Sequence, residues 1–260
     1  MIVVVLGMHR SGTSAVANVL QHLGVNMGDR LFEANQWNPQ GYYEDVDFFD
    51  VNVELVHAAG GHWGDPPEAT RIREVGAWFI PQMVQIVRWK ERARGVWGWK
   101  DPRTAITMPV WWEAIRQVGV QDVRIVRTVR SQWGMLQSLA KRAREASALA
   151  VETGEEDAGL AEMATWENDW WAALIPTTIK LAAGSVTATW ENDRWAALIH
   201  EYELRALQFL GDHPDVPCMT VRFEELVRAE TTRKVVSGLA EFVEADARLV
   251  EGAVEQVVVR

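Results

Sequence analysis

Short apolar runs alternate along the chain with stretches whose apolar residues recur every three to four positions. The apolar runs have the length and composition of buried parallel strands, and they are Ile2–Leu6, Val96–Trp99, Val123–Val129 and Cys218–Phe223. The stretches with helical period cover 12–23, 45–59, 71–94, 107–118 and 132–150. Strands that alternate with helices predict an α/β protein with three layers, α/β/α, around a central parallel sheet.

One segment of the chain occurs twice. The sequence ATWENDWWAALI at 164–175 returns as ATWENDRWAALI at 188–199, with Trp170 of the first copy replaced by Arg194 in the second. The copies start 24 positions apart. Each copy has the period of one helix face, and two copies are too few for a solenoid.

The repeat lies in a region that we expect to form a helical lid. Pro176 and Gly184 should separate the two copies into two helices. No glycine- or serine-rich linker and no change of composition marks a domain boundary. We therefore expect a single domain, 1–260, with a helical insertion at about 139–200 that contains the tandem repeat.

Composition narrows the class of protein. The formal net charge of −10 argues against binding nucleic acid or acidic membranes through bulk charge. Cys218 is the one cysteine, which excludes an intrachain disulfide framework and fits a reducing compartment. The opening apolar run is too short for a signal peptide, and no window has the length of a membrane span. We expect a cytoplasmic protein and leave its oligomeric state open.

Tryptophan is unusually frequent, with 14 residues against 3 tyrosines. Most of these large rings are expected to fill the core and the seams between helices. A minority is expected to line a cleft, where flat aromatic faces can stack on sugars or other rings.

The first apolar run leads into a glycine-bracketed turn, Gly7-Met-His-Arg-Ser-Gly12, and then into a helical pattern. This order aims backbone N–H groups and the positive end of a helix dipole at an anion. The spacing matches a P-loop, but Thr13 stands where a P-loop has lysine, and the positive charge sits inside the turn at Arg10. The candidate anion-binding residues are Arg10, Ser11, Gly12, Thr13 and Ser14.

Two further cations stand at the ends of predicted strands. Arg130 follows the third strand, and Ser138 lies eight positions later on the next predicted helix, so the two can hold a second phosphate. Lys100 ends the second strand at a Lys-Asp-Pro turn. That position faces the crevice where open α/β sheets bind ligands. A strand-end lysine that only extends to solvent is the alternative for Lys100.

Taken in order, these segments resemble sulfotransferases that use 3′-phosphoadenosine 5′-phosphosulfate, in particular their bacterial and phage-like branch. The resemblance runs from residue 7 to about 226. It rests on His9-Arg-Ser-Gly-Thr-Ser14, Asn38-Pro-Gln-Gly-Tyr-Tyr-Glu-Asp45, Lys100-Asp-Pro, Arg130 with Ser138, and Val221-Arg-Phe-Glu-Glu-Leu226.

The resemblance implies the donor, the reaction and the site. It implies transfer of a sulfuryl group from 3′-phosphoadenosine 5′-phosphosulfate to a hydroxyl or amine of a small-molecule or carbohydrate acceptor. The products are the sulfated acceptor and adenosine 3′,5′-bisphosphate, and no metal takes part. Arg10 and its loop would hold the 5′-phosphosulfate, Arg130 and Ser138 the 3′-phosphate. Lys100 would assist catalysis, and Glu44 would be the base.

The sequence departs from the cytosolic sulfotransferases in three places. It lacks their histidine base after the second strand. It lacks their C-terminal Arg-Lys-Gly, because Arg233-Lys234 is followed by Val235. It also lacks the aromatic residue that stacks on adenine just after the phosphosulfate loop, so the adenine contacts stay unassigned.

Several alternatives remain open at this point. Glu44 can instead be an acid that stabilises the start of the next helix. Asp45, His57 and His62 are the other candidate bases, and His9 is expected to shape its turn. Two rival functions are a P-loop nucleotide kinase or hydrolase, and a non-catalytic nucleotide-binding module. The first is disfavoured because no predicted strand ends in an aspartate that could hold Mg²⁺.

Overall fold

The computed structural model describes residues 1–34, 38, 41–92, 95–141 and 188–258. The chain divides into two compact units. One consists of Met1–Arg130 and His200–Arg260, and the other is Ser131–Ile199.

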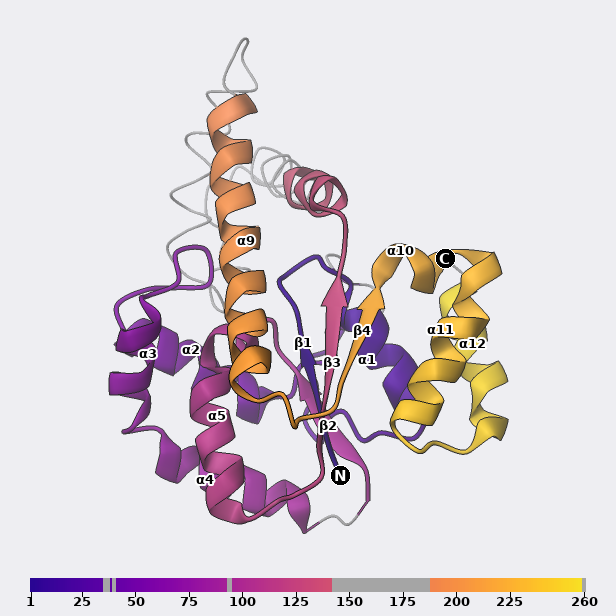
Figure 1. Cartoon of the computed structure of the whole chain (residues 1–260), viewed down its shortest axis with the longest axis horizontal. Coiled ribbons are helices and arrows are strands. Elements are labelled where there is room, and N and C mark those ends of the chain that lie inside the picture. Colours follow the sequence, from indigo (N-terminus) through magenta and orange to yellow (C-terminus); the bar gives the residue numbers. More distant parts are fainter. Residues whose placement is uncertain (35–37, 39–40, 93–94, 142–187, 259–260) are drawn as a thin grey trace. The chain divides into compact units, whose positions relative to one another are not determined.

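The first unit is built on a sheet of four parallel strands in the order β2-β1-β3-β4 (Figure 1). The strands are β1 (Ile2–Leu6), β2 (Trp97–Lys100), β3 (Val123–Val129) and β4 (Cys218–Arg222). Helices flank the sheet on both faces, which confirms the predicted three-layer α/β/α fold. Because every strand runs the same way, the residues that follow the four strands meet at one edge.

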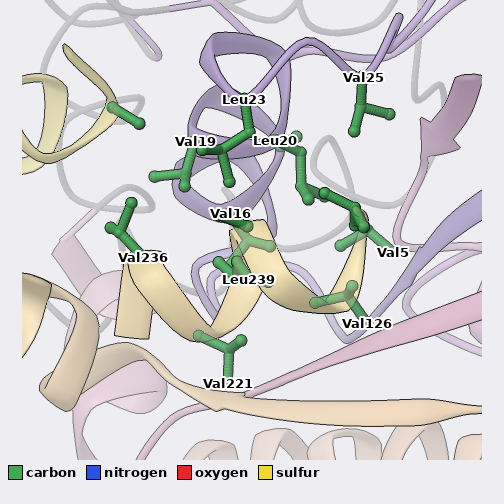
Figure 2. Packing of buried hydrophobic residues seen from close by; sticks show 14 of the residues in the cluster. Val5, Val16, Val19, Leu20, Leu23, Val25, Val126, Val221, Val236 and Leu239 are labelled. Carbon is green, nitrogen blue, oxygen red and sulfur yellow. The ribbon is translucent and has the colours of Figure 1, made fainter. Parts of the chain in front are cut away.

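Helices α1 (Thr13–His22), α11 (Ala229–Phe242) and α12 (Val250–Val258) cover one face of the sheet. Figure 2 shows their aliphatic side chains packed against those of the strands. Val5, Val126 and Val221 come from three different strands and meet Leu20 and Leu239 from the helices. This face is almost purely aliphatic.

The opposite face carries an aromatic cluster beneath α2 (Val46–Ala58) and α5 (Thr104–Val118). The Phe48 ring stacks on Trp99 with centroids 4.5 Å apart, and it lies 4.9 Å from Trp111. Trp97 borders the same cluster. These tryptophans fill the core as expected, whereas Trp78 is 85 % exposed.

The predicted helix 71–94 is wrong, because the structure has two helices there, α3 (Ala69–Gly76) and α4 (Ile80–Glu91). Two residues explain the break. Gly76 packs so closely on α5 that an added Cβ would lie 2.5 Å from Val110 Cγ2. Pro81 stands in the first turn of α4, where its missing N–H costs no hydrogen bond.

The C-terminal part of the first unit is more helical than the periodicity predicted. Helices α10 (Phe223–Val227), α11, the short 3₁₀ helix η1 (Ala247–Leu249) and α12 follow β4. Strand β4 was predicted to be buried, but it is an outermost strand of the sheet, and its residues Cys218, Thr220 and Arg222 are exposed.

The second repeat copy, 188–199, begins the helix α9 (Ala188–Asp212), which continues without a break beyond the repeat. The first copy, 164–175, and most of the expected lid at 139–200 lie outside the described residues. The lid and the single-domain organisation therefore stay predictions. Within the described part of the chain, no helix combines the length and apolarity needed to cross a membrane.

Candidate functional site

The glycine-bracketed turn after β1, residues 7–12, is called the opening loop here. Its backbone takes the left-handed region twice, at Arg10 (φ 69°) and at Gly12 (φ 98°). The second position requires glycine, since a Cβ there would lie 2.3 Å from Phe223 Cδ2. A left-handed arginine is a strained residue held by its surroundings, a feature that clusters at functional sites.

Helix α1 begins directly after the opening loop and has no side chain capping its first turn. The Val16 N–H donates to the Gly12 carbonyl, so the N–H groups of the residues before it, Thr13 to Ala15, have no partner within the helix. The helix start therefore has the geometry that the sequence predicts for an anion site, and anion binding there stays a prediction.

The hydroxyl of Ser11 is directed differently from the prediction. It is hydrogen-bonded to the Thr128 hydroxyl of β3 at 2.8 Å, and the Ser11 residue is 2 % exposed. Gly7 lies against the same contact, since a Cβ there would be 2.1 Å from Thr128 Oγ1. The Ser11 hydroxyl therefore fixes the loop on the sheet in this structure.

Arg130 crosses to the opening loop from the end of β3. Its Nη1 donates to the Arg10 carbonyl at 3.1 Å, and its guanidinium lies 4.5 Å above the Phe223 ring. Burial lowers the pKa of Arg130, and Glu224 opposes that shift. The structure thus brings Arg10, Arg130 and Phe223 together at one edge of the sheet.

Ser138, the predicted partner of Arg130, belongs to the other unit of the chain. It lies in a helical segment, 132–141. Its part in a shared phosphate site stays a prediction.

Lys100 and Glu44, 56 residues apart in the sequence, form a buried ion pair. Lys100 is the last residue of β2, and its Nζ donates both to Glu44 Oε1 and to the Tyr42 carbonyl, the latter at 3.0 Å. Lys100 is 2 % exposed and Glu44 is 7 % exposed. Burial raises the pKa of Glu44, and the positive charge of Lys100 partly offsets that rise.

The Tyr42 carbonyl links this pair to the start of α1. It also accepts a hydrogen bond from Ser14 Oγ at 3.3 Å, and Asn38 Nδ2 donates to the same Ser14 oxygen at 3.5 Å. The next residue, Tyr43, has φ 55°, and its hydroxyl donates to Asn18 Oδ1 of α1 at 2.9 Å. The segment before α2 is thus fastened to α1 at two points.

Asp45, a candidate base from the sequence, has a structural position. It caps α2 by accepting the Asp47 N–H, and it also accepts the Asp29 N–H at 2.7 Å and Lys90 Nζ at 2.7 Å. Asp45 is 1 % exposed. These contacts occupy both carboxylate oxygens, so they disfavour Asp45 as the base.

The histidines at positions 9, 57 and 62 lie in other surroundings. His57 is exposed on α2, and His62 Nδ1 accepts the Gly64 N–H at 3.1 Å. The His9 ring packs against Trp63, with centroids 4.7 Å apart, and meets Tyr202 edge-on at 6.2 Å. Glu44 is therefore the candidate base that the geometry favours.

A buried polar network supports the Lys-Asp-Pro turn. Asp101 accepts Asn52 Nδ2 at 2.9 Å on one oxygen, and the Arg103 N–H and Nη1 at 2.9 and 3.0 Å on the other. Asn52 Oδ1 in turn accepts bonds from Thr107 and from the Trp111 indole. Because each group has a partner, the turn that carries Lys100 is held rigidly.

Sequence reasoning missed Phe223, Thr128 and Asn52. A signal for Phe223 was present, because a residue that follows a parallel strand lies at the ligand-binding edge. No comparable signal marks Thr128 or Asn52, whose contacts with the site lie 117 and 49 residues away in the sequence.

No family model matches the chain, and no curated protein is similar to it in sequence.

Proposed function

We propose that this chain is a sulfotransferase that moves a sulfuryl group from 3′-phosphoadenosine 5′-phosphosulfate to a hydroxyl or amine of a small-molecule or carbohydrate acceptor. The observation that carries the proposal is the buried Lys100–Glu44 pair, which shares the Tyr42 carbonyl with Ser14 at the start of α1. A cation at a strand end, a base paired with it, and a helix start suited to an anion are the groups that sulfuryl transfer requires.

The residues at the sheet edge suit an anionic nucleotide. Arg10 and the first N–H groups of α1 would hold the 5′-phosphosulfate, and Arg130 would hold the 3′-phosphate. The Phe223 ring lies against Gly12 and beneath the Arg130 guanidinium, and we assign it to the adenine, for which the sequence predicts no contact. The molecule is acidic as a whole, so Arg10 and Arg130 make this edge locally more positive, whereas the charge of Lys100 is paired with Glu44.

Glu44 would take the proton of the acceptor hydroxyl or amine as the acceptor oxygen or nitrogen bonds to sulfur. The bond between sulfur and the bridging phosphate oxygen breaks in the same step. Lys100 and Arg10 would stabilise the negative charge that develops on that departing oxygen. A raised pKa makes Glu44 a stronger base than an exposed glutamate, although Lys100 must move from it toward the leaving group.

Ligand-dependent thermal unfolding tests the nucleotide. We expect adenosine 3′,5′-bisphosphate to raise Tm, because a ligand that binds only the folded state stabilises it by mass action. ATP with Mg²⁺ is the comparison. A rise in Tm with ATP and Mg²⁺ but not with the bisphosphate would favour a kinase or hydrolase and overturn the proposal.

Turnover tests the reaction. Incubation with the labelled sulfuryl donor and a panel of phenols, sugars and amines should yield a labelled product. Binding of the bisphosphate together with no product from any acceptor class would favour a non-catalytic nucleotide-binding module.

A further inference from the structure

A second pocket lies away from the opening loop, between α3, α5 and the C-terminal half of α9. Its volume is about 320 Å³, which is within the range of pockets for small organic ligands. None of the residues that line it belongs to the opening loop, and neither Glu44, Lys100 nor Arg130 is among them. The proposed transfer reaction therefore does not account for it.

One wall of this pocket holds a buried arginine with an unused donor. Arg205 is 8 % exposed and lies in α9. Its Nε donates to Glu201 at 2.6 Å, and its Nη2 donates to the Pro67 carbonyl at 2.7 Å. Its Nη1 is buried and has no hydrogen-bond partner. A buried donor left in this state is costly, so an acceptor at this place would stabilise the fold.

A second buried donor without a partner lies beside the same pocket. Trp112 Nε1 has no acceptor, and its ring packs on Phe209 and His213, both of which line the pocket. The ring centroids of Phe209 and His213 lie 5.6 and 5.0 Å from that of Trp112. Both unused groups are donors, and so a ligand rich in acceptor atoms fits them.

Charge and apolarity define the ligand further. Arg73 and Arg205 line the pocket together with one carboxylate, Asp212, and Arg205 is also paired with Glu201, so the pocket suits a single negative charge better than a dianion. Ile106 and Phe209 supply apolar walls. The guanidinium fork of Arg73 matches a carboxylate in shape, and Arg205 Nη1 can donate one further hydrogen bond. We propose that this pocket binds a small organic monocarboxylate that has an apolar or aromatic body.

Benzoate is the probe for this site, and benzamide, which has the same shape without the charge, is its control. Titration calorimetry and ¹H–¹⁵N spectra of the full chain report on binding. We expect benzoate to bind more tightly than benzamide and to shift the Trp112 indole signal, assigned by its loss in Trp112→Phe. Equal binding of the two probes, or no binding of benzoate, would overturn the proposal.

Two arginine variants locate the binding. Arg73→Gln changes an exposed side chain and should leave the fold intact, whereas Arg205→Gln removes a buried one. Each is expected to weaken benzoate binding about tenfold, the loss that follows from one charge-assisted hydrogen bond. Arg71→Gln is the matched control, since Arg71 lies on the same helix, pairs with Glu74 and does not line the pocket.

The test still stands if Arg205→Gln fails to fold, because Arg73→Gln alone then locates the binding site. Benzoate affinity that is unchanged in Arg73→Gln, or that falls equally in Arg71→Gln, would contradict the assigned site.

Discussion

Individual side chains at the strand ends carry the proposed chemistry. The sequence predicts that Lys100 lies at the end of a strand, and it is the last residue of β2; its place in a ligand crevice stays a prediction. Glu44 came from the resemblance, because one acid before a helix looks like any other in sequence. Only the fold shows that these two residues share a buried contact.

Glu44→Gln tests the base. We expect bisphosphate binding to persist and turnover to fall by about 10²–10⁴-fold, the usual contribution of a general base. Steady-state kinetics and Tm shifts separate the two effects. Glu54→Gln, an exposed acid on α2, should leave both unchanged. Retained turnover in Glu44→Gln would place the base elsewhere.

The pH profile adds an independent measurement. A base must be deprotonated, so kcat/KM falls as the pH drops through its pKa. Burial raises the pKa of Glu44, and we expect this acidic limb above about 4.3, the ordinary value for glutamate. A limb at or below the ordinary value would argue against Glu44.

Arg130→Ala tests the second phosphate grip. Removing this guanidinium should weaken adenosine 3′,5′-bisphosphate by about tenfold or more, because a charge-assisted hydrogen bond is lost. Arg127→Ala is the control from the same strand; Arg127 Nε reaches Thr220 on β4 and not the opening loop. Isothermal titration calorimetry measures the affinity of each variant for the bisphosphate. Equal losses in the two variants would show a general electrostatic effect and no specific grip.

Gly12→Ala tests the close approach of the opening loop to Phe223. Gly119 has a similar φ, 88°, and an added Cβ there meets nothing within 4 Å. Both alanine variants should lose about 1–2 kcal/mol of unfolding free energy from the left-handed backbone. Gly12→Ala should lose more, because its Cβ collides with the Phe223 ring. Equal losses in urea denaturation would remove the steric argument.

At the scale of elements, the prediction was best where the period of apolar residues decides the structure. The strands and α2 follow their expected ranges within a residue or two. The split between α3 and α4 was missed although Pro81 marks a helix start in the sequence; the packing of Gly76 on Val110 of another helix could not be read from the period. The start of α2 also depends on a residue distant in the sequence. Its capping residue, Asp45, accepts a hydrogen bond from Lys90, 45 residues away.

Lys90→Met tests this tie between α4 and the start of α2. Lys90 is 4 % exposed and lies within 3.2 Å of Asp29, Asp45 and Asp47. Removing the cation leaves buried Asp45 without its charge partner, so we expect a loss of about 3–5 kcal/mol of unfolding free energy. Arg233→Met, which breaks an exposed pair with Glu251, should have little effect. Similar losses from both would contradict a special role for the buried cluster.

At the scale of the whole molecule, the order of strands and helices was enough to predict a parallel α/β sheet. The helical C-terminal part was missed, although the buried residues of α11, Thr232, Val236, Leu239 and Ala240, recur with a helical period that the sequence contains. Prediction of the candidate site from the sequence is limited in a different way. Residues at strand ends can be found from the order of elements, but Phe223, Thr128 and Asn52 join the site through tertiary packing.

Leu239→Ala tests the aliphatic face. Leu239 is fully buried in the cluster between α11 and the sheet, so its truncation should cost about 2–5 kcal/mol of unfolding free energy. Leu249, which is 40 % exposed, should tolerate alanine with a change within about 0.5 kcal/mol. Denaturant midpoints measure both. A small loss at Leu239 would mean that α11 contributes little to holding the sheet.

The Tyr42 carbonyl has a consequence for how this site can change by mutation. A main-chain oxygen is present whatever the amino acid, so substitutions at Tyr42 leave the acceptor for Ser14 and Lys100 in place. Its position is instead specified by the two neighbours, Gly41 and Tyr43, which both have positive φ. Mutations at Gly41 and Tyr43 should therefore disturb this hydrogen-bond acceptor more than mutations at Tyr42 do.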